Sequence, residues 1–263
     1  MLIGLDVDGT LLHVDESISD AVREQVDRVQ RLGHEVTLAT GRSWETAAPI
    51  LDGLGLAPEY VVCANGATVM QRDLAEPSGY RREWVETFDP TEVLETIRGH
   101  LPRGSYLVED AVGFRRYTEG MTEWSLTNAE QVDFEQLSGF PASRVVVVSP
   151  DLGTEEFLHI VRSMGLTEVS YSIGWTAWLD IAPIGVNKAT ALERVRDELR
   201  IPGSEVLVVG DGRNDVEMFR WAVAGGGRAV AMGQAPDEVK AAANEITGAV
   251  DDDGLAAVLA RID

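Results

Sequence analysis

The chain has 263 residues and a formal net charge of −22, and 44% of its residues are hydrophobic. This apolar share is enough to build a sizeable core, which argues against a globally disordered chain, and no apolar run approaches the ~20 residues of a membrane span. The acidic balance argues against nucleic acid and anionic membranes as partners, because both are bound through Lys and Arg. A phosphorylated substrate is still compatible with it, since a metal ion and one lysine can invert the field at a single site.

The first part of the chain alternates predicted strands and helices. Strands are expected at 2–7, 35–39 and 60–63, and helices at 19–32 and 46–54. Apolar residues at helical spacing support the first helix, and a glycine follows each of the two, where helices commonly end. Strands that alternate with helices predict a doubly wound, mostly parallel, Rossmann-like α/β sheet.

The pattern changes after about residue 79, where helices and hairpins predict an α+β segment with an antiparallel sheet. The expected elements are helices at 90–100 and 154–164, a β-branched strand at 144–149, and hairpins at 105–117 and 168–182. A linker is expected from Pro183 to Gly185. The α+β segment before this linker would form its own sheet, separate from the parallel one.

The alternating pattern then returns and continues to the end of the chain. The expected elements are helices at 188–199, 215–223, 236–244 and 254–261, and strands at 205–209 and 228–232. The simplest architecture is one α/β core made of residues 1–82 and 184–263, with an α+β cap domain at 83–183 inserted into it.

The cysteine content and the first residues predict the compartment. The single cysteine, Cys63, cannot form an internal disulfide, which fits a reducing environment. The first residues lack the basic segment that signal peptides carry, so none is expected. We therefore expect a cytoplasmic protein that is a monomer or a small homo-oligomer.

Two carboxylates follow the first predicted strand. Asp6 and Asp8 are two residues apart, and Gly9 then lets the backbone turn. Side chains at i and i+2 share one face of a strand, and ligands of open α/β sheets bind where strands end, so both acids are expected to point at one site. Two close like charges are costly unless a cation joins them or one keeps a proton. The pair therefore predicts a Mg²⁺ site, a nucleophile beside a general acid, or both.

Three further segments lie at the same predicted edge of the sheet. They are Thr-Gly-Arg at 40–42, Lys188 at the start of the helix after the cap, and Gly-Asp-Gly-Arg-Asn-Asp at 210–215. Each alone is compatible with a helix cap, a turn or a solvated surface. Together, in this order and at one edge, they predict phosphoryl transfer.

In such a reaction the acidic residues would carry the chemistry. Asp6 would attack phosphorus and become an acyl phosphate, while Asp8 would protonate the leaving oxygen and then deprotonate water. A Mg²⁺ ion held by Asp6, the Asp8 backbone carbonyl and Asp211 would screen the attacking carboxylate from the phosphate dianion.

Other groups at this edge would bind the phosphate. Thr40 and Lys188 would hold its equatorial oxygens, where charge resides in a loose transition state. The backbone N–H groups of Gly9 and Thr10 would add an anion nest. The sequence contains no Gly-Lys-Ser/Thr loop, so P-loop hydrolysis of nucleoside triphosphates is not expected.

Four segments together resemble the motifs of the haloacid dehalogenase (HAD) superfamily. They read Asp-Val-Asp-Gly-Thr-Leu-Leu at 6–12, Ala-Thr-Gly-Arg at 39–42, the lone lysine at 188, and Gly-Asp-Gly-Arg-Asn-Asp at 210–215. The chain is most similar to the Cof-type phosphatases, which carry a large α+β cap of the C2 type between the second and third motifs. The Asn-Gly-Ala turn at 65–67 and the Ala-Met-Gly-Gln-Ala segment at 231–235 also resemble that group.

The resemblance implies a Mg²⁺-dependent phosphatase that acts through an aspartyl phosphate on a small phosphorylated metabolite, such as a sugar phosphate. It implies that Asp6 is the nucleophile and Asp8 the general acid and base, with Lys188 also catalytic. The full set of candidates is Asp6, Asp8, Asp211 and Asp215 for the metal, and Gly9, Thr10, Thr40, Gly41, Lys188 and Asn214 for phosphate.

Substrate specificity is expected to come mainly from the cap, which would close over the core and exclude water. The candidates are Arg42, Asn65, Arg115, Arg116, Trp175 and Asp180, with Asn65 supporting a loop that faces the substrate. Arg115 and Arg116 would point to opposite faces of a strand, so at most one can reach the site. Two alternatives stay open: a phosphomutase that uses the same phospho-aspartate, and a non-enzymatic ligand-binding protein on this fold.

Overall fold

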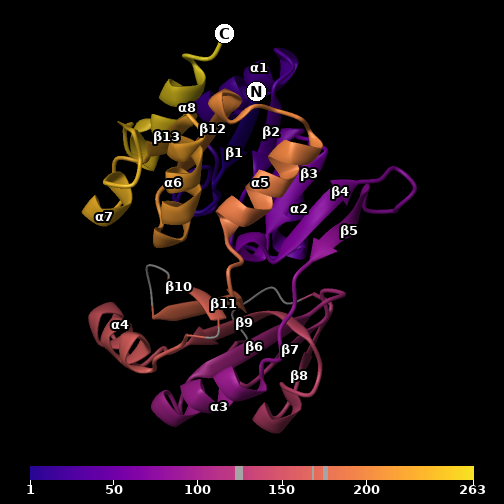
Figure 1. The fold of residues 1–263 in the computed structure, drawn as a ribbon, viewed down its shortest axis with the longest axis vertical. Coiled ribbons are helices and arrows are strands. Elements are labelled where there is room, and N and C mark those ends of the chain that lie inside the picture. The colour runs from indigo at the N-terminus through magenta and orange to yellow at the C-terminus, as the bar shows by residue number, and fades with distance from the viewer. Residues whose placement is uncertain (122–126, 168, 174–176) are drawn as a thin grey trace. The chain divides into compact units, whose positions relative to one another are not determined.

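The computed structural model (Figure 1) describes residues 1–121, 127–167, 169–173 and 177–263. The chain divides into two compact units. One consists of Met1–Glu83 with Asn187–Asp263, and the other of Trp84–Val186; they are called here the core and the cap. Within the described ranges, no helix has the length and apolar character needed to span a bilayer.

A parallel sheet organises the core, with the strand order β14-β13-β12-β1-β2. Its strands are β1 (Leu2–Leu5), β2 (Glu35–Leu38), β12 (Val206–Gly210), β13 (Arg228–Ala231) and β14 (Glu245–Ile246). β1 lies between β12 and β2 and runs parallel to both. The segments that follow these strands therefore leave the sheet at one edge, as the α/β prediction requires.

Helices cover both faces of the core sheet (Figure 1). They are α1 (Asp20–Arg31), α2 (Trp44–Leu54), α5 (Lys188–Glu198), α6 (Val216–Ala224), α7 (Asp237–Lys240) and α8 (Gly254–Leu259). Ile3 and Leu5 of β1 share a buried cluster with α1, α2 and α8. Gly4 faces α5 instead, and a Cβ built on it would lie 3.4 Å from Leu192. Burial on both faces explains the uninterrupted apolar sequence of β1.

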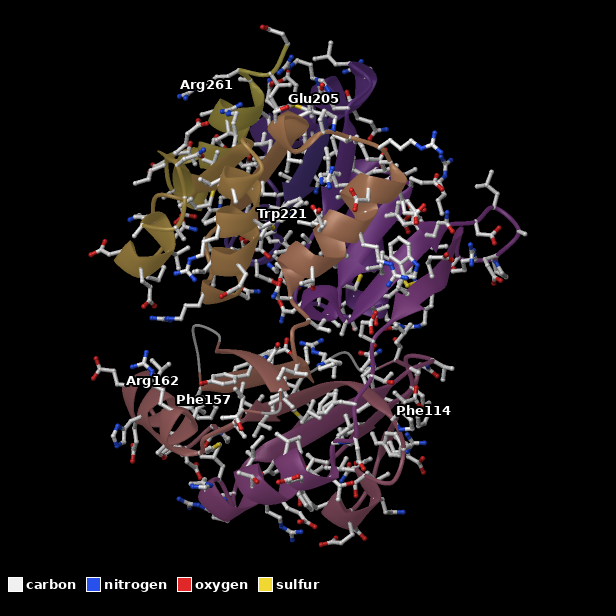
Figure 2. The ribbon with its side chains drawn as sticks, in the orientation of Figure 1. Phe114, Phe157, Arg162, Glu205, Trp221 and Arg261 are labelled. Carbon is white, nitrogen blue, oxygen red and sulfur yellow. The ribbon has the colours of Figure 1, made fainter. Side chains whose placement is uncertain are left out.

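Local capping fixes where α5 begins. Asn187 accepts the backbone N–H of Thr190 on its Oδ1 at 3.1 Å, which satisfies a donor in the first turn of the helix. Lys188 is therefore the first helical residue. Farther along, Trp221 of α6 donates from Nε1 to Glu193 of α5 at 2.7 Å, which ties the two helices together (Figure 2).

An antiparallel extension follows β3 (Tyr60–Cys63) and was absent from the sequence-based prediction. β4 (Thr68–Arg72) pairs antiparallel with β3, and β5 (Tyr80–Val85) lies beyond β4. A bridge between Ala39 and Val62 joins β3 to the end of β2. The prediction missed β4 because its apolar stretch is short and begins almost directly after the Asn-Gly turn.

The cap contains a sheet with the strand order β10-β11-β9-β6-β7-β8. The bounds are β6 (Ser105–Asp110), β7 (Arg115–Tyr117), β8 (Ala129–Gln131), β9 (Ala142–Val148), β10 (Val169–Ile173) and β11 (Trp178–Pro183), with helices α3 (Thr91–His100) and α4 (Thr154–Ser163). The β7–β8 pair is parallel, whereas the other pairs are antiparallel. Phe157 of α4 and Ile97 of α3 pack with Val145 and Val147 in the cap core (Figure 2).

Some local predictions differ from the structure. β8 was not expected, because its short Ala-Glu-Gln sequence shows no strand pattern. The helix expected at 236–244 is limited to Asp237–Lys240. It stops because Asn244 turns back to β13, where it accepts from the backbone N–H of Ala229 and donates to the carbonyl of Gly227. The hairpin turn expected at 174–176 lies outside the described residues.

Candidate active site

Lys188 joins two aspartates at the carboxyl edge of the core sheet. Its Nζ donates to Oδ1 of Asp6 at 2.6 Å and to Oδ1 of Asp215 at 2.7 Å. Asp6 follows β1 directly, and Asp215 follows β12 after a short loop. All three residues are buried, and Lys188 is 0% exposed. The topology thus brings together three residues that were predicted from separate segments.

Asp215 also shapes the loop after β12. Its Oδ2 accepts the backbone N–H groups of Asp211 at 3.0 Å and Gly212 at 2.9 Å. Only glycine fits at position 210, because a Cβ on Gly210 would lie 2.3 Å from this oxygen. Both oxygens of Asp215 therefore have partners, and this carboxylate seats Lys188 on one side and the Asp211 loop on the other.

Asp6, Asp211 and Asp215 form a buried acidic triad, in which each offers one carboxylate oxygen within 4.8 Å of the others. Burial, reinforced by Asp215, raises the pKa of Asp211 to about 7. Burial also raises the pKa of Asp6 well above its ordinary value, with Asp215 adding to the effect and Lys188 opposing it. Burial alone would lower the pKa of Lys188, but the carboxylates of Asp215 and Asp6 outweigh this and raise it.

The triad has the chemistry of a site for a hard divalent cation. Among the described residues, Lys188 is the cation that pairs with it, so three buried carboxylates face one ammonium. Loss of solvation and repulsion between the carboxylates raise the pKa values of Asp6 and Asp211. A further positive charge would offset both effects by stabilising the ionised carboxylates. Carboxylate oxygens are the ligands that Mg²⁺ and Ca²⁺ prefer.

Asp8 lies on Arg42 rather than in the triad. Its side chain is 58% exposed, and Arg42 donates to both of its oxygens, from Nε to Oδ2 at 3.0 Å and from Nη2 to Oδ1 at 2.6 Å. Glu16 accepts from the same Nη2 at 3.0 Å. The prediction that Asp6 and Asp8 share one face assumed strand alternation, but β1 ends at Leu5, and the Asp8 carboxylate pairs with Arg42 while that of Asp6 pairs with Lys188. Arg42, expected to contact substrate, is bound to Asp8 and Glu16 here.

The turn after Asp8 does not form the expected anion nest. The N–H of Gly9 donates to the carbonyl of Leu12 at 3.0 Å, and that of Thr10 to the carbonyl of Val7 at 3.3 Å. Both donors are therefore used inside the turn, which also holds Gly9 at a φ of +77°. The Thr10 hydroxyl is buried and has no hydrogen-bond partner among the described residues.

Asn65 ties two of the candidate phosphate-binding loops together. Its N–H donates to the carbonyl of Thr40 at 2.9 Å, and its Oδ1 accepts from Nδ2 of Asn214 at 3.0 Å. A Cβ on Gly41 would lie 3.3 Å from the Asn65 amide, so the loops are in close contact. Thr40 accepts the N–H of Arg42 on Oγ1 at 3.0 Å. Its hydroxyl hydrogen is then available to donate to a bound anion.

Two of the specificity candidates in the cap are buried against partners within the cap. Asp180 accepts from Arg144, from Nε at 2.8 Å and from Nη2 at 2.9 Å, and both residues are buried. Arg115 is also buried and donates to the carbonyl of Thr127. Arg144 was not predicted, because nothing in the sequence pairs it with an acid on β11.

The other two specificity candidates in the cap are Arg116, which has partners within the cap, and Trp175. Arg116 lies 3.5 Å from Asp110, and its guanidinium carbon lies 4.2 Å from the ring centroid of Phe140. These contacts hold it by charge and by stacking on an aromatic face. Trp175 lies outside the described residues.

Gln234 contacts the site although no role was predicted for it. Its Nε2 donates to Oδ2 of Asp211 at 3.2 Å and to the carbonyl of Gly9 at 2.5 Å. Its Oε1 accepts the N–H of Val250 at 3.1 Å. The only sequence signal was its place in the segment 231–235, which resembles the Cof-type phosphatases without implying a function for this residue.

Fold and site together define an α/β enzyme with a buried acidic site at the carboxyl edge of a parallel sheet. Residues 3–259 match the haloacid dehalogenase-like hydrolase family. The chain therefore belongs to this family, and within it to the Cof-type phosphatases that act on small phosphorylated substrates.

Curated relatives align over nearly the whole chain. The 5-amino-6-(5-phospho-D-ribitylamino)uracil phosphatase YitU of Bacillus subtilis is 30% identical, over 98% of this chain and 96% of that protein. The phosphoglycolate phosphatase of Natronomonas pharaonis is 29% identical, over 98% and 96%. The pyridoxal phosphate phosphatase YbhA of Escherichia coli is 27% identical, over 97% and 96%.

Solved structures show the same fold, cap included. The HAD subclass IIB sugar phosphatase BT4131 has a TM-score of 0.80 at 20% identity and covers 98% of this chain and 97% of its own. TM0651 from Thermotoga maritima has a TM-score of 0.76 at 22% identity, with 100% and 97% covered. At these identities the likeness concerns the fold alone.

Proposed function

We propose that this protein is a Mg²⁺-dependent phosphomonoesterase that works through an aspartyl phosphate on Asp6. One observation carries the proposal. Asp6 is buried at the end of β1 and held by the ammonium of Lys188, and it lies within 4.8 Å of two further carboxylates, so that one ammonium serves three buried acids. A buried carboxylate fixed by a single lysine beside an acidic site is arranged for attack on a phosphate whose charge a metal ion neutralises.

The side chains that would hold Mg²⁺ are those of Asp6, Asp211 and Asp215. Asp215 also binds Lys188. The ion would screen the negative charge of phosphate from the attacking carboxylate. Lys188 contributes the second positive charge and orients Asp6 by binding its Oδ1. Oδ2 is then the atom that we assign as the nucleophile.

In the first step Oδ2 of Asp6 forms a bond to phosphorus while the bond from phosphorus to the ester oxygen breaks. Asp8 supplies a proton to the leaving oxygen. In the second step water attacks the phosphorus of the acyl phosphate, Asp8 accepts a proton from that water, and the bond to Asp6 breaks to release inorganic phosphate. Asp8 is restored to its protonated form and Asp6 to its carboxylate.

The position of Asp8 adds a condition to this scheme. Both of its oxygens accept hydrogen bonds from Arg42 in this structure. To reach the leaving oxygen, Asp8 must exchange at least one of these bonds. Its side chain is 58% exposed, and we assign this exchange to a rotation about the side-chain torsions.

The substrate that we propose is a small phosphorylated metabolite, such as a sugar phosphate. The relatives support this class, since their names refer to phosphate esters of a ribitylamino compound, of glycolate and of pyridoxal. We assign substrate selection to the cap, Trp84–Val186. The single, buried Cys63 supports a cytoplasmic location.

The test is phosphate release from a panel of phosphomonoesters, with and without Mg²⁺. The key variant is Asp6→Asn, which keeps the shape of the side chain and removes its nucleophilic charge. Asp27→Asn is the matched control, because Asp27 is exposed on α1 and pairs only with Arg31 among the described residues. We expect the wild type and the control to release phosphate only with Mg²⁺, and Asp6→Asn to release none.

Two outcomes would contradict the proposal. Substantial turnover by Asp6→Asn would remove Asp6 as the nucleophile, and full activity of the wild type in chelator would remove the metal. Mass spectrometry after rapid acid quenching adds a direct check, since the wild type should carry one phosphoryl group on the peptide that contains Asp6.

A further inference from the structure

The amide of Gln234 has one orientation that satisfies all three of its contacts. Two acceptors, Oδ2 of Asp211 and the carbonyl of Gly9, lie on the Nε2 side. A donor, the N–H of Val250, lies on the Oε1 side at 3.1 Å. Turning the amide over would place oxygen against oxygen twice and N–H against N–H once. The surroundings therefore fix which end faces Asp211.

The carboxylate of Asp211 is packed from behind as well. A Cβ built on Gly9 would lie 2.2 Å from its Oδ2 and 3.0 Å from its Oδ1. The backbone N–H of Asp211 is held by Asp215, which fixes the start of the loop. Oδ2 thus sits between the Gly9 backbone and the Gln234 amide, so Oδ1 is the oxygen better placed to meet a cation.

We propose that Gln234 is a positioning residue for the metal site: it fixes the Asp211 carboxylate, and the turn that contains Gly9, in the arrangement that binds Mg²⁺. The inference rests on the proposed function and adds to it a residue outside the candidate ligands. Gln234 does not contact the reacting atoms. It acts through Asp211 and through the backbone that follows Asp8.

The size of the effect follows from the behaviour of groups that hold metal ligands in place. Removing such a partner typically weakens metal binding or activity by roughly 10–100-fold, because the ligand must then be ordered when the metal binds. Substrate affinity at saturating metal should change little, since Gln234 is not expected to touch phosphate. Substitution of Gln234 should therefore raise the dissociation constant for Mg²⁺ and leave the KM for substrate nearly unchanged.

The experiment measures Mg²⁺ binding to metal-free protein by titration calorimetry, together with steady-state kinetics. Gln234→Met keeps the length of the side chain and removes both amide functions, and Gln234→Ala is the second variant if the first does not fold. Thr247→Val is the matched control: it removes the hydrogen bond from Thr247 to the carbonyl of Gly254, which braces the same segment as Val250 without touching Asp211. Any effect of Gln234 on that segment alone should appear in the control.

We expect the dissociation constant for Mg²⁺ to rise roughly 10–100-fold in the Gln234 variants and less than about threefold in Thr247→Val. The KM for substrate at saturating Mg²⁺ should stay near that of the wild type. Unchanged Mg²⁺ binding in Gln234→Met, or equal weakening in Thr247→Val, would overturn the inference while leaving the proposed function intact. A wild type that binds no divalent cation would overturn the metal part of the proposed function and this inference with it.

Discussion

The ionised carboxylate of Asp211 should lower the free energy of unfolding of the metal-free protein, and the substitution Asp211→Asn should raise it again. Burial, with Asp215 adding to it, raises the pKa of Asp211 to about 7, whereas an aspartate in an unfolded chain titrates near ~3.9. The folded state binds this proton more tightly than the unfolded state. Protonated Asp211 therefore contributes its full stability to the folded state below the unfolded pKa. This contribution is lost as the pH rises through about 7. The gap of about three pKa units corresponds to about 4 kcal/mol.

The variant places a neutral amide of the same shape at position 211. Its oxygen can still accept from Gln234, and the like charge that faced Asp215 is gone. Without metal, we expect wild type and variant to be equally stable near about pH 4, and the variant to be up to about 4 kcal/mol more stable near about pH 8. Mg²⁺ should reverse the order at high pH, because only the wild type keeps the full triad to bind it.

Urea unfolding in chelator, followed by tryptophan fluorescence across this pH range, measures the difference. Asp27→Asn again controls for the loss of one negative charge from a chain whose net charge is −22. The reasoning would be refuted if metal-free Asp211→Asn were less stable than wild type at high pH. It would fail equally if the stability difference did not change with pH.

Three further substitutions test other contacts. Lys188→Met should lower kcat by roughly 10²–10³-fold, because it removes the charge that orients Asp6; steady-state kinetics at saturating Mg²⁺ measure this. Arg42→Met removes the hydrogen bonds that hold the Asp8 carboxylate. The kcat should therefore fall more for an alkyl phosphate than for p-nitrophenyl phosphate, whose leaving group needs no proton. Equal losses for the two substrates would contradict this role of Asp8. Gly9→Ala forces a Cβ into a positive φ and against the triad, and denaturant unfolding should show a loss of about 1–3 kcal/mol.

Much of the core could be predicted from the sequence because its signals are local. The apolar run of β1, the glycines after the helices and the acidic segments at strand ends each depend on neighbours in the chain. Parallel pairing then places Asp6 and Asp211 at one edge of the sheet without further information. The meeting of Lys188 with Asp6 needed only that α5 begin near this edge, which the Asn187 cap secures.

Contacts that depend on register or on a turn could not be predicted in the same way. The pair Arg144–Asp180 joins β9 to β11, and only their observed register places the two side chains side by side. The pairing of Asp8 with Arg42 involves a residue beyond the end of β1, and sequence patterns locate the ends of elements poorly. The same limit applies to Gln234, because its partners belong to loops that follow two other strands.

Two of the contacts that join loops at this edge are made by neutral amides, and this has a physical reason. Asn65 binds Asn214, and Gln234 binds Asp211, without adding charge to the site. A lysine or arginine at position 234 would place a positive charge on Asp211 and compete with a metal ion for its oxygens. An amide can hold a carboxylate in position and still leave its negative charge uncompensated. Under the proposed function, such amides would position the metal ligands while leaving the charge that a cation neutralises, and the high pKa of Asp211 reflects the cost of that charge in stability.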